Sequence, residues 1–258
     1  MAIYIKGMGR NMKVGIIGGT GYYKWQGEEI EIETIYGNVI SYYLRIGNKD
    51  VFFIPRHGKK HKPAHAVNYF ANIKAMKEIG VEAILSINTV GSLRKNIKPG
   101  SIFIPNDFID FTKRKTTFYN DIAIHVDLSQ PFCPIVREVL INRAKKYGEV
   151  YEGIYIATEG PRLETKAEIS MFKNFADVVG MTLVPEAILA REVGICYASI
   201  CLVSNYAAGL QEKINIREIK EIQEKKREII IKILNESVRI LPKKRNCNCK
   251  YAFEKGKL

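Results

Sequence analysis

The feature that most constrains this chain is a repeated alternation of short apolar runs with segments of helical periodicity. Each apolar run follows the two-residue period of a strand and ends at glycine or polar residues. The segments between them place apolar residues every three or four positions, as amphipathic helices do. This order predicts an α/β fold. The predicted strands cover 14–17, 50–55, 83–90, 100–111, 153–158 and 196–204, and the predicted helices include 66–80, 164–176 and 184–194.

A long helix is predicted near the end of the chain. Apolar residues recur at helical spacing from Ile216 onward, and Pro242 ends the pattern. Asn215, with Glu218 three residues later, resembles a capping box at the start of this helix. No repeat, low-complexity tract or linker divides the chain. The expected parts are an extension at 1–11, one domain at 12–241 and a basic tail at 242–258.

The chain has 258 residues and a formal net charge of +13. Such an excess suits nucleic acid, a membrane surface or a small anion such as phosphate. The tail carries six basic residues and one acidic residue, so we interpret the excess as a solvated face and tail and expect no nucleic-acid partner. No run approaches the ~18 apolar residues of a membrane span, and no secretory signal is visible. We therefore expect a cytoplasmic protein without a membrane partner.

The five cysteines show no paired C-x-x-C motifs, so we expect no metal site. Cys196 and Cys201 lie in apolar runs, which predicts packing roles. Cys247 and Cys249 stand close together in the basic tail, where we expect them to be exposed. A disulfide there stays open, because intracellular proteins of hyperthermophiles can carry them.

The stretch GIIGGTG at 15–21 follows the first predicted strand. Its glycines do not match the G-x-G-x-x-G order of dinucleotide-binding proteins, which argues against NAD. Backbone N–H groups of the turn and the Thr20 hydroxyl could cradle one phosphate. A plain tight turn is the alternative.

The stretch PRHGKKHKPAH at 55–65 follows another strand and is rich in basic residues. Arg56 can hold a phosphate bidentately, and His57 can add a donor. The three histidines of this stretch could instead bind a metal from one helix face, but Gly58 and Pro63 interrupt such a helix. A charged surface loop is the remaining alternative.

Two further strands end in polar residues. Asn88 and Thr89 close the run at 83–90, and Asn205 interrupts the apolar run CLVSNYAAGL. A carboxamide both donates and accepts hydrogen bonds, so Asn205 suits a ligand that presents both kinds of edge.

The chain resembles the trimeric purine nucleoside phosphorylases, in particular their methylthioadenosine phosphorylase branch. The resemblance runs from about residue 13 to 240 through motifs that include VGIIGGTG, PRHGKKH, PGSIFIPNDFIDFT, TEGPRLETKAE and GMTLVPEAILAREVGICYASI. It implies a single-domain, three-layer α/β/α fold with a central mixed sheet, assembled as trimers or dimers of trimers. It also implies no metal or cofactor, with inorganic phosphate as co-substrate for the phosphorolysis of a nucleoside.

The resemblance assigns site residues by their places in these motifs. Met181 and Thr182 would face the ribose, and Leu163, Glu164 and Asn205 would line the base. The phosphate site would consist of Thr20, Arg56, His57, Asn88, Thr89 and Thr182.

Two departures from the methylthioadenosine branch concern the base. That branch resembles this chain but has aspartates where Asn205 and Ala207 stand here, and a small polar residue where Glu164 stands. An ionised aspartate would face the O6 acceptor of hypoxanthine or guanine unfavourably, whereas a carboxamide N–H can donate to it. Glu164 can accept from N1–H of the same base. The alternative is that Glu164 is an acidic residue at a helix N-terminus, where the helix dipole stabilises it. We therefore expect Asn205 and Glu164, with His57, to act in cleavage of a 6-oxopurine nucleoside.

The 5′ end of the sugar is less constrained. Ile216 and Ile219 could form an apolar pocket for a methylthio group or belong to the helix core, and His61 and His125 could lie nearby, the latter from a neighbouring subunit. The expected reaction converts S-methyl-5′-thioinosine and phosphate to hypoxanthine and S-methyl-5-thioribose 1-phosphate. Inosine or guanosine phosphorolysis is the alternative, and a nucleic-acid-binding protein or an inactive scaffold are the rivals from other classes.

Overall fold

The computed structural model describes residues 11–22 and 25–258, so nearly all of the expected extension at 1–11 lies outside the described residues. The described chain forms one large sheet with helices on both faces. The strands are β1 (Met12–Gly18), β2 (Glu28–Ile32), β3 (Val39–Ile46), β4 (Lys49–Pro55), β5 (Ala83–Ser92), β6 (Ile102–Phe111), β7 (Val150–Thr158), β8 (Val178–Gly180) and β9 (Cys196–Tyr206). The α-helices are α1 (Tyr69–Glu78), α2 (Pro134–Ala144), α3 (Lys166–Phe172), α4 (Leu183–Glu192), α5 (Ile216–Ile240) and α6 (Ala252–Gly256), with short 3₁₀ turns at Ala64–Ala66 and Cys249–Tyr251.

The sheet is mixed and closes on itself at one end. Its strand order is β2-β3-β4-β1-β5-β8-β7-β6-β9, and β9 also pairs with β5. The strands β5, β8, β7, β6 and β9 therefore form a ring in which the β5–β8 and β6–β9 pairs are antiparallel. The other end of the sheet is an open, twisted layer that carries the antiparallel strands β2 and β3.

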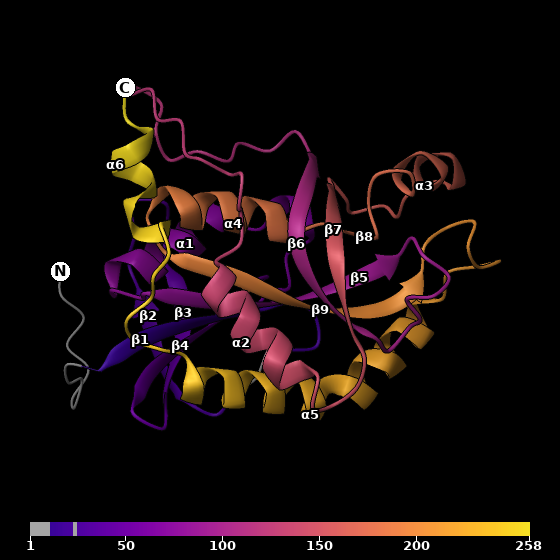
Figure 1. Ribbon diagram of the computed structural model, residues 1–258, viewed down its shortest axis with the longest axis horizontal. Coiled ribbons are helices and arrows are strands. Elements are labelled where there is room, and N and C mark those ends of the chain that lie inside the picture. Colours follow the sequence, from indigo (N-terminus) through magenta and orange to yellow (C-terminus); the bar gives the residue numbers. More distant parts are fainter. Residues whose placement is uncertain (1–10, 23–24) are drawn as a thin grey trace.

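Helices cover both faces of the sheet, which gives three layers (Figure 1). The residues of α1 and α4 belong to one buried cluster, and those of α2 and α5 belong to another. Both clusters draw residues from the same strands because successive side chains of a strand point to opposite faces. The expected three-layer α/β fold with a central mixed sheet is confirmed.

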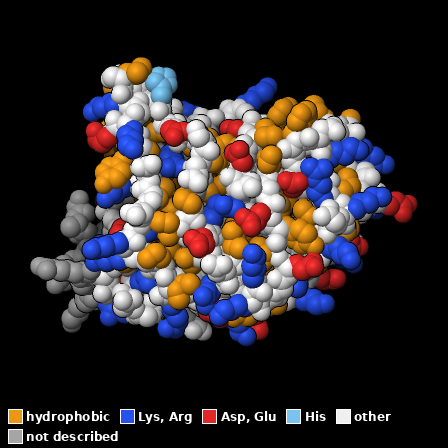
Figure 2. All heavy atoms as spheres, in the orientation of Figure 1, with side chains coloured by type: hydrophobic (Ala, Val, Ile, Leu, Met, Phe, Trp, Pro, Cys, Tyr) orange, Lys and Arg blue, Asp and Glu red, His pale blue; other side chains and the backbone are white. Residues whose placement is uncertain are grey.

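The charged side chains on the face drawn in Figure 2 are interspersed, with Lys and Arg beside Asp and Glu. No single basic stripe dominates this face. No helix in the described chain has the length and apolar character needed to cross a bilayer.

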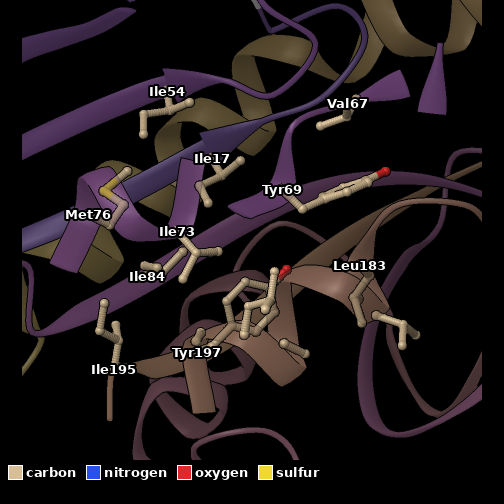
Figure 3. Close-up of a cluster of buried hydrophobic side chains, with 14 of the residues drawn as sticks. Ile17, Ile54, Val67, Tyr69, Ile73, Met76, Ile84, Leu183, Ile195 and Tyr197 are labelled. Carbon is tan, nitrogen blue, oxygen red and sulfur yellow. The ribbon is translucent and has the colours of Figure 1, made fainter. Parts of the chain in front are cut away.

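The larger buried cluster surrounds the strands that lead to the site (Figure 3). Ile17 of β1 and Ile54 of β4 are almost fully buried there, and Tyr69, Leu183 and Tyr197 are 5 % exposed or less. Burying each large side chain contributes about 1.5–3 kcal/mol, so this packing holds the strand ends firmly.

All the expected strands and helices are present, with ends shifted by a few residues. The strands β2, β3 and β8 and the helices α2 and α6 are additional. The expected capping box at α5 is incomplete, since Asn215 caps the Arg217 N–H and meets Glu218 through side chains alone. A full capping box instead begins α3, between Thr165 and Glu168.

The basic tail is not solvated along its whole length, because part of it packs against the rest of the protein. Ala252 is 7 % exposed, and Cys249 is 2 % exposed. The expectation that Cys247 and Cys249 are exposed is wrong, because Cys249 is buried and Cys247 is half-buried. The tail folds back onto the body of the molecule beside α4 (Figure 1).

Candidate active site

Parallel strands deliver several loops to one edge of the sheet. β1 runs parallel to β4, with Gly18 opposite Pro55, and β5 runs parallel to β9, with Gly91 opposite Asn205. The turn after β1, the basic loop after β4 and the polar ends of β5 and β9 therefore open at the same edge. Ligands of α/β sheets bind at this edge because the carboxyl ends of parallel strands meet there.

The glycines of the turn after β1 are required by close approach to neighbours. A Cβ on Gly18 would lie 2.6 Å from the Phe53 ring, and a Cβ on Gly19 would lie 2.7 Å from Arg56 Nη1. Neither distance leaves room for a side chain. The backbone of the turn consequently lies directly against the Arg56 guanidinium, with Thr20 half-buried at its tip.

Arg56 is fixed by hydrogen bonds to protein groups. Its Nε and Nη2 donate to the Glu186 carboxylate, Nη2 also donates to Ser86 Oγ at 2.7 Å, and Nη1 donates to the Ile87 carbonyl at 2.8 Å. A guanidinium has five N–H donors, and the described residues engage four of them, so one on Nη1, beside Gly19, is available to a ligand. We expected Arg56 to bind phosphate bidentately, but its bidentate hydrogen bonds are made to the Glu186 carboxylate.

The Arg56–Glu186 pair is buried, and neighbouring protein groups form hydrogen bonds to both side chains. The Glu186 carboxylate also accepts hydrogen bonds from the Tyr197 hydroxyl at 2.8 Å and from Ser86 Oγ at 3.2 Å. Burial alone would lower the pKa of Arg56, but the Glu186 charge outweighs it and holds the pKa of Arg56 above its ordinary value. The guanidinium therefore stays charged and oriented before any anion arrives, which is the arrangement that stabilises developing charge best.

His57 is held in one tautomer. Its Nδ1 lies 2.7 Å from the Lys62 carbonyl, which can only accept, so Nδ1 carries the hydrogen. Burial, the Arg56 charge and the neighbouring His61 lower the pKa of His57 to about 4. At neutral pH its Nε2 is thus an acceptor. A neutral ring would not add the expected donor at Nε2 but would accept there from a phosphate O–H or a sugar hydroxyl.

Asn88 is used to position other residues. Its amide donates to Ser86 Oγ at 2.9 Å and to Ser199 Oγ at 2.7 Å, and its carbonyl oxygen accepts from Thr182 Oγ1 at 2.7 Å. Both amide hydrogens are engaged, so Asn88 has no donor left for phosphate. It links Thr182 to the network around Arg56 and orients the Thr182 hydroxyl.

Gln223 of α5 joins the two threonines expected at the phosphate. Its amide donates to Thr89 Oγ1 at 2.9 Å and lies 3.5 Å from the Thr20 carbonyl oxygen. The Thr89 oxygen accepts this bond, so its own hydroxyl hydrogen is available to a ligand. Gln223 is 5 % exposed, which makes the link a fixed part of the site.

Glu164 lies at the start of α3 beside the end of β7. One of its carboxylate oxygens accepts from Thr158 Oγ1 at 2.6 Å. Among the described residues, its other oxygen has no hydrogen-bond donor. Thr165 and Glu168 form the capping box that begins α3 immediately after it. The cap fixes the backbone at Glu164, and the carboxylate keeps one oxygen to accept from a ligand.

Asn205 lies at the end of β9, near the α3 segment. Its Oδ1 accepts from Ser204 Oγ at 2.7 Å, and one amide hydrogen goes to the Tyr206 carbonyl at 2.8 Å. No other described residue accepts from this amide, so its second hydrogen is available to a ligand. A Cβ on Gly209 would lie 3.6 Å from Lys166 Cγ, so the loop after Asn205 contacts the first turn of α3.

Met181 is held by an arginine that the sequence did not single out. Arg114 donates to the carbonyls of Met181 and Glu159 and to the Glu159 carboxylate. It also lies 5.4 Å from the centre of the Tyr69 ring. A Cβ on Gly160 would lie 2.6 Å from Met181 Sδ, so this loop packs closely on the Met181 side chain.

The remaining expected residues are less closely tied to this network. Leu163 is 41 % exposed beside Glu164, and Ala207 is buried in a small cluster with residues of α3, β7 and β8. The rings of His61 and His57 are 5.0 Å apart. His125 is exposed, and its backbone pairs with Gly256 of α6, away from α3 in Figure 1.

The start of α5 is apolar and open. Ile216 is 56 % exposed, and Ile219 is half-buried outside the large core clusters. The alternative that Ile216 belongs to the helix core is therefore wrong. The core stripe of α5 begins further along, with Gln223 and Ile230 buried.

Sequence reasoning missed Glu186, Gln223 and Arg114. Each supports a binding residue from another part of the chain, so no local spacing reveals it. A buried carboxylate or amide on an apolar helix face was the available signal, because such groups are seldom buried unless they are paired.

These features define a nucleoside phosphorylase of α/β architecture, and a family model described as the phosphorylase superfamily matches residues 13–239. The chain belongs to this superfamily. It is a pentosyltransferase of the nucleoside phosphorylase type.

Several curated relatives match over nearly their whole length. A probable S-methyl-5′-thioinosine phosphorylase from Methanopyrus kandleri is 46 % identical, over 94 % of this chain and 98 % of the relative. An S-methyl-5′-thioadenosine phosphorylase from Pyrococcus abyssi is 47 % identical, over 92 % and 96 %. A 6-oxopurine nucleoside phosphorylase from Pyrococcus furiosus is 42 % identical, over 94 % and 98 %.

A solved structure shares the fold closely. The Q289L mutant of adenosine/methylthioadenosine phosphorylase from Schistosoma mansoni, in complex with tubercidin, superposes with a TM-score of 0.89. It is 31 % identical, and the match covers 96 % of this chain and 99 % of that one.

Proposed function

We propose that this enzyme cleaves 6-oxopurine nucleosides with phosphate, and that S-methyl-5′-thioinosine is its preferred substrate. The proposal rests on two unused groups, one amide N–H on Asn205 at the end of β9 and one carboxylate oxygen on Glu164 just before α3. A 6-oxopurine presents an O6 acceptor and an N1–H donor, so the two groups complement its edges.

The names of the relatives do not decide the base, because proteins of similar identity are named for thioinosine, thioadenosine and 6-oxopurine nucleosides. The residues that we expect at the base support a 6-oxopurine. An adenine would offer its 6-amino group to the Asn205 amide, which would place two donors opposite each other. A mismatched polar pair in a dry pocket costs enough to discriminate strongly between substrates.

The phosphate would bind between the turn after β1 and the fixed guanidinium. The Arg56 N–H beside Gly19 and the hydroxyl of Thr89 supply donors. Neutral His57 would accept the O–H of monohydrogen phosphate at Nε2, which turns the unprotonated oxygens toward the sugar. The nucleophile is thereby held in one orientation, which lowers the barrier by removing orientational freedom.

In the reaction, a phosphate oxygen attacks C1′ while the bond from C1′ to the purine breaks. The sugar passes through an oxocarbenium-like state, and the electron pair of the broken bond collects on the purine. Asn205 donates to O6 or N7 as that charge develops, so its contribution is greatest in the transition state. Glu164 orients the base through N1–H.

The preference for a methylthio group rests on the start of α5. Ile216 and Ile219 present apolar surface that the core does not use. A methylthio group gains from such contact, whereas a 5′-hydroxyl would lose a polar partner. Inosine and guanosine are the second candidates, because close relatives are named 6-oxopurine nucleoside phosphorylases.

The test measures phosphate-dependent release of base from methylthioinosine, inosine, guanosine and methylthioadenosine. We expect kcat/KM to rank methylthioinosine first and methylthioadenosine below it. Asn205→Asp should reverse the preference between the two bases by about 100-fold or more, the usual effect of one transition-state donor. If methylthioadenosine ranks first in the unmodified enzyme, the base assignment fails.

A further inference from the structure

Four of the five cysteines meet at the end of β9 opposite Asn205. The sulfur atoms of Cys133, Cys196, Cys247 and Cys249 all lie within 4.8 Å of one another. Cys133 precedes α2, Cys196 begins β9, and the other two belong to the tail. All four are free thiols. The fold has therefore gathered thiols from three separate segments into one cluster.

The separations suit a tetrahedral metal ion. A zinc ion with Zn–S bonds of 2.3 Å places its four sulfurs about 3.8 Å apart. The Cys196 and Cys247 sulfurs are 3.5 Å apart, and since all four sulfurs lie within 4.8 Å of one another, no separation exceeds the tetrahedral value by more than about 1 Å. Small side-chain rotations would bring all four sulfurs onto one ion. Four thiolates in this arrangement select zinc over harder cations.

The surroundings would compensate the charge of such a site. Four thiolates around a divalent cation leave two negative charges. The Arg245 guanidinium is largely buried, pairs with Glu82 and lines the same cavity as Cys196 and Cys247. The amino end of α2 follows Cys133 directly, and the positive end of a helix dipole favours anionic ligands.

A solvent path reaches the cluster. A cavity of about 600 Å³ is lined by Cys196 and Cys247 together with the basic residues Lys244, Arg245 and Lys250. A metal ion could enter along this path, and the thiol protons could leave by it. The basic lining explains part of the charge excess of the tail without a nucleic-acid partner.

The backbone around the cluster is closely docked. The Cys133 N–H donates to the Tyr197 carbonyl at 2.8 Å, which places Cys133 beside the start of β9. Gly194 has φ +75°, and a Cβ there would lie 3.1 Å from the Lys250 carbonyl oxygen. The tail thus crosses directly over the loop that leads into β9.

We propose that Cys133, Cys196, Cys247 and Cys249 bind one structural Zn²⁺ per subunit and thereby fasten the tail to the sheet. On binding, the four thiols release four protons to solvent, and no atom changes its oxidation state. The site takes no part in phosphorolysis, since it lies at the far end of β9. It departs from the expectation of no metal, which rested on the missing C-x-x-C spacing.

The test uses the full-length enzyme, expressed without a histidine tag and purified without oxygen or chelators. Elemental analysis should find about one zinc per subunit in the unmodified enzyme. Cys247→Ser and Cys249→Ser should reduce the zinc content to near zero. The matched control is Cys201→Ser, which changes a fully buried cysteine on the same strand outside the cluster, and it should keep the zinc.

Two further measurements distinguish loss of the metal site from misfolding of a variant. Cobalt substitution should give the absorption bands of tetrahedral thiolate-bound Co²⁺ in the unmodified enzyme and in Cys201→Ser, but not in Cys247→Ser. A strong chelator should lower the melting temperature of the unmodified enzyme and leave that of Cys247→Ser unchanged, while base release at moderate temperature persists in both. Absence of metal, with the cysteines found as free thiols or as disulfides by mass spectrometry, would overturn the proposal.

Discussion

At the scale of single residues, the site depends on which hydrogen-bonding groups remain unused. Four donors of Arg56 and both amide hydrogens of Asn88 are engaged by protein groups. The groups left for ligands are few and oriented, such as one N–H of Arg56 and one N–H of Asn205. Residue types alone do not reveal this, because the same arginine could bind phosphate with one or with several donors.

Replacing Glu186 with glutamine should impair phosphate binding and stability together. The substitution leaves the buried Arg56 charge without its partner, which typically costs about 3–5 kcal/mol of folding free energy. We expect kcat/KM for phosphate to fall by about 100-fold, since the guanidinium loses its fixed orientation. Steady-state kinetics with varied phosphate and thermal unfolding check both effects.

The matched control is Glu192→Gln, which changes a buried carboxylate on the same helix that accepts the Phe118 N–H. It should lower stability while leaving the KM for phosphate unchanged. Equal loss of phosphate affinity in both variants would show that the effect comes from α4 as a whole rather than from Arg56.

The pH dependence of stability should include a contribution from His57. Its folded pKa is about 4, below the ordinary value of 6.5, because burial and Arg56 disfavour the charged ring. The unfolded chain therefore takes up this proton first as the pH falls. The stabilisation is present above pH 6.5 and is lost between pH 6.5 and 4, by at most about 3 kcal/mol.

Denaturant unfolding between pH 7 and 4 measures this contribution. The unmodified protein should lose more stability across that range than His57→Gln, whose side chain does not titrate. His65→Gln, at an exposed histidine, is the control and should follow the unmodified protein. Identical slopes for all three proteins would contradict the neutral His57.

At the scale of elements, the helix ends place the substrate-facing residues. The capping box of α3 fixes the backbone next to Glu164, and α5 reaches Thr89, an expected phosphate residue, through Gln223. The first turn of α5 extends past the core and leaves Ile216 exposed. The exposed side chain of Ile216 is therefore available to contact a ligand.

Replacing Ile216 with asparagine should alter the choice at the 5′ end of the sugar. Because Ile216 is 56 % exposed, the stability should change by no more than about 0.5 kcal/mol. The ratio of kcat/KM for methylthioinosine to that for inosine should fall by about 10-fold, the loss expected for one apolar contact. Ile240→Asn, at the exposed far end of α5, should leave the ratio unchanged.

At the scale of the whole molecule, one surface suggests assembly. Phe111 is 54 % exposed and packs edge-on against Phe172 of α3, with ring centres 5.1 Å apart. Met171 and Phe175, on either side of Phe172, are 44 % and 61 % exposed. Contiguous apolar side chains of this kind mark interaction surfaces. His125, which contacts the tail of its own chain, is exposed for contact with a neighbour.

This patch favours self-association, and the resemblance to trimeric purine nucleoside phosphorylases implies a homotrimer or a dimer of trimers in solution. Sedimentation analysis should give a mass of three or six subunits. Phe175→Glu should shift the mass toward the monomer, while Ile35→Glu, at an exposed apolar residue outside this patch, should not. A monomeric unmodified enzyme that retains full activity would contradict the expectation.

The sequence predicted those candidate site residues that lie next to a recognisable strand. Arg56 and Asn205 follow apolar strands directly, and strand ends in α/β folds face the ligand. Glu186, Gln223 and the cysteine cluster were missed because their partners are distant in sequence. Glu186 reaches Arg56 across 130 positions, and Gln223 reaches Thr89 across 134.

The sequence by itself determined the order of strands and helices, the glycine turn, and the residue types that we expect at the phosphate and base. Local backbone preference and hydrophobic periodicity act over a few residues, so they are readable from the chain. Only the tertiary structure decided which donors of Arg56 remain free, that His57 is neutral, and that four cysteines meet. These outcomes depend on contacts between distant segments, and burial sets the charge and hydrogen bonding of each group only once those contacts form.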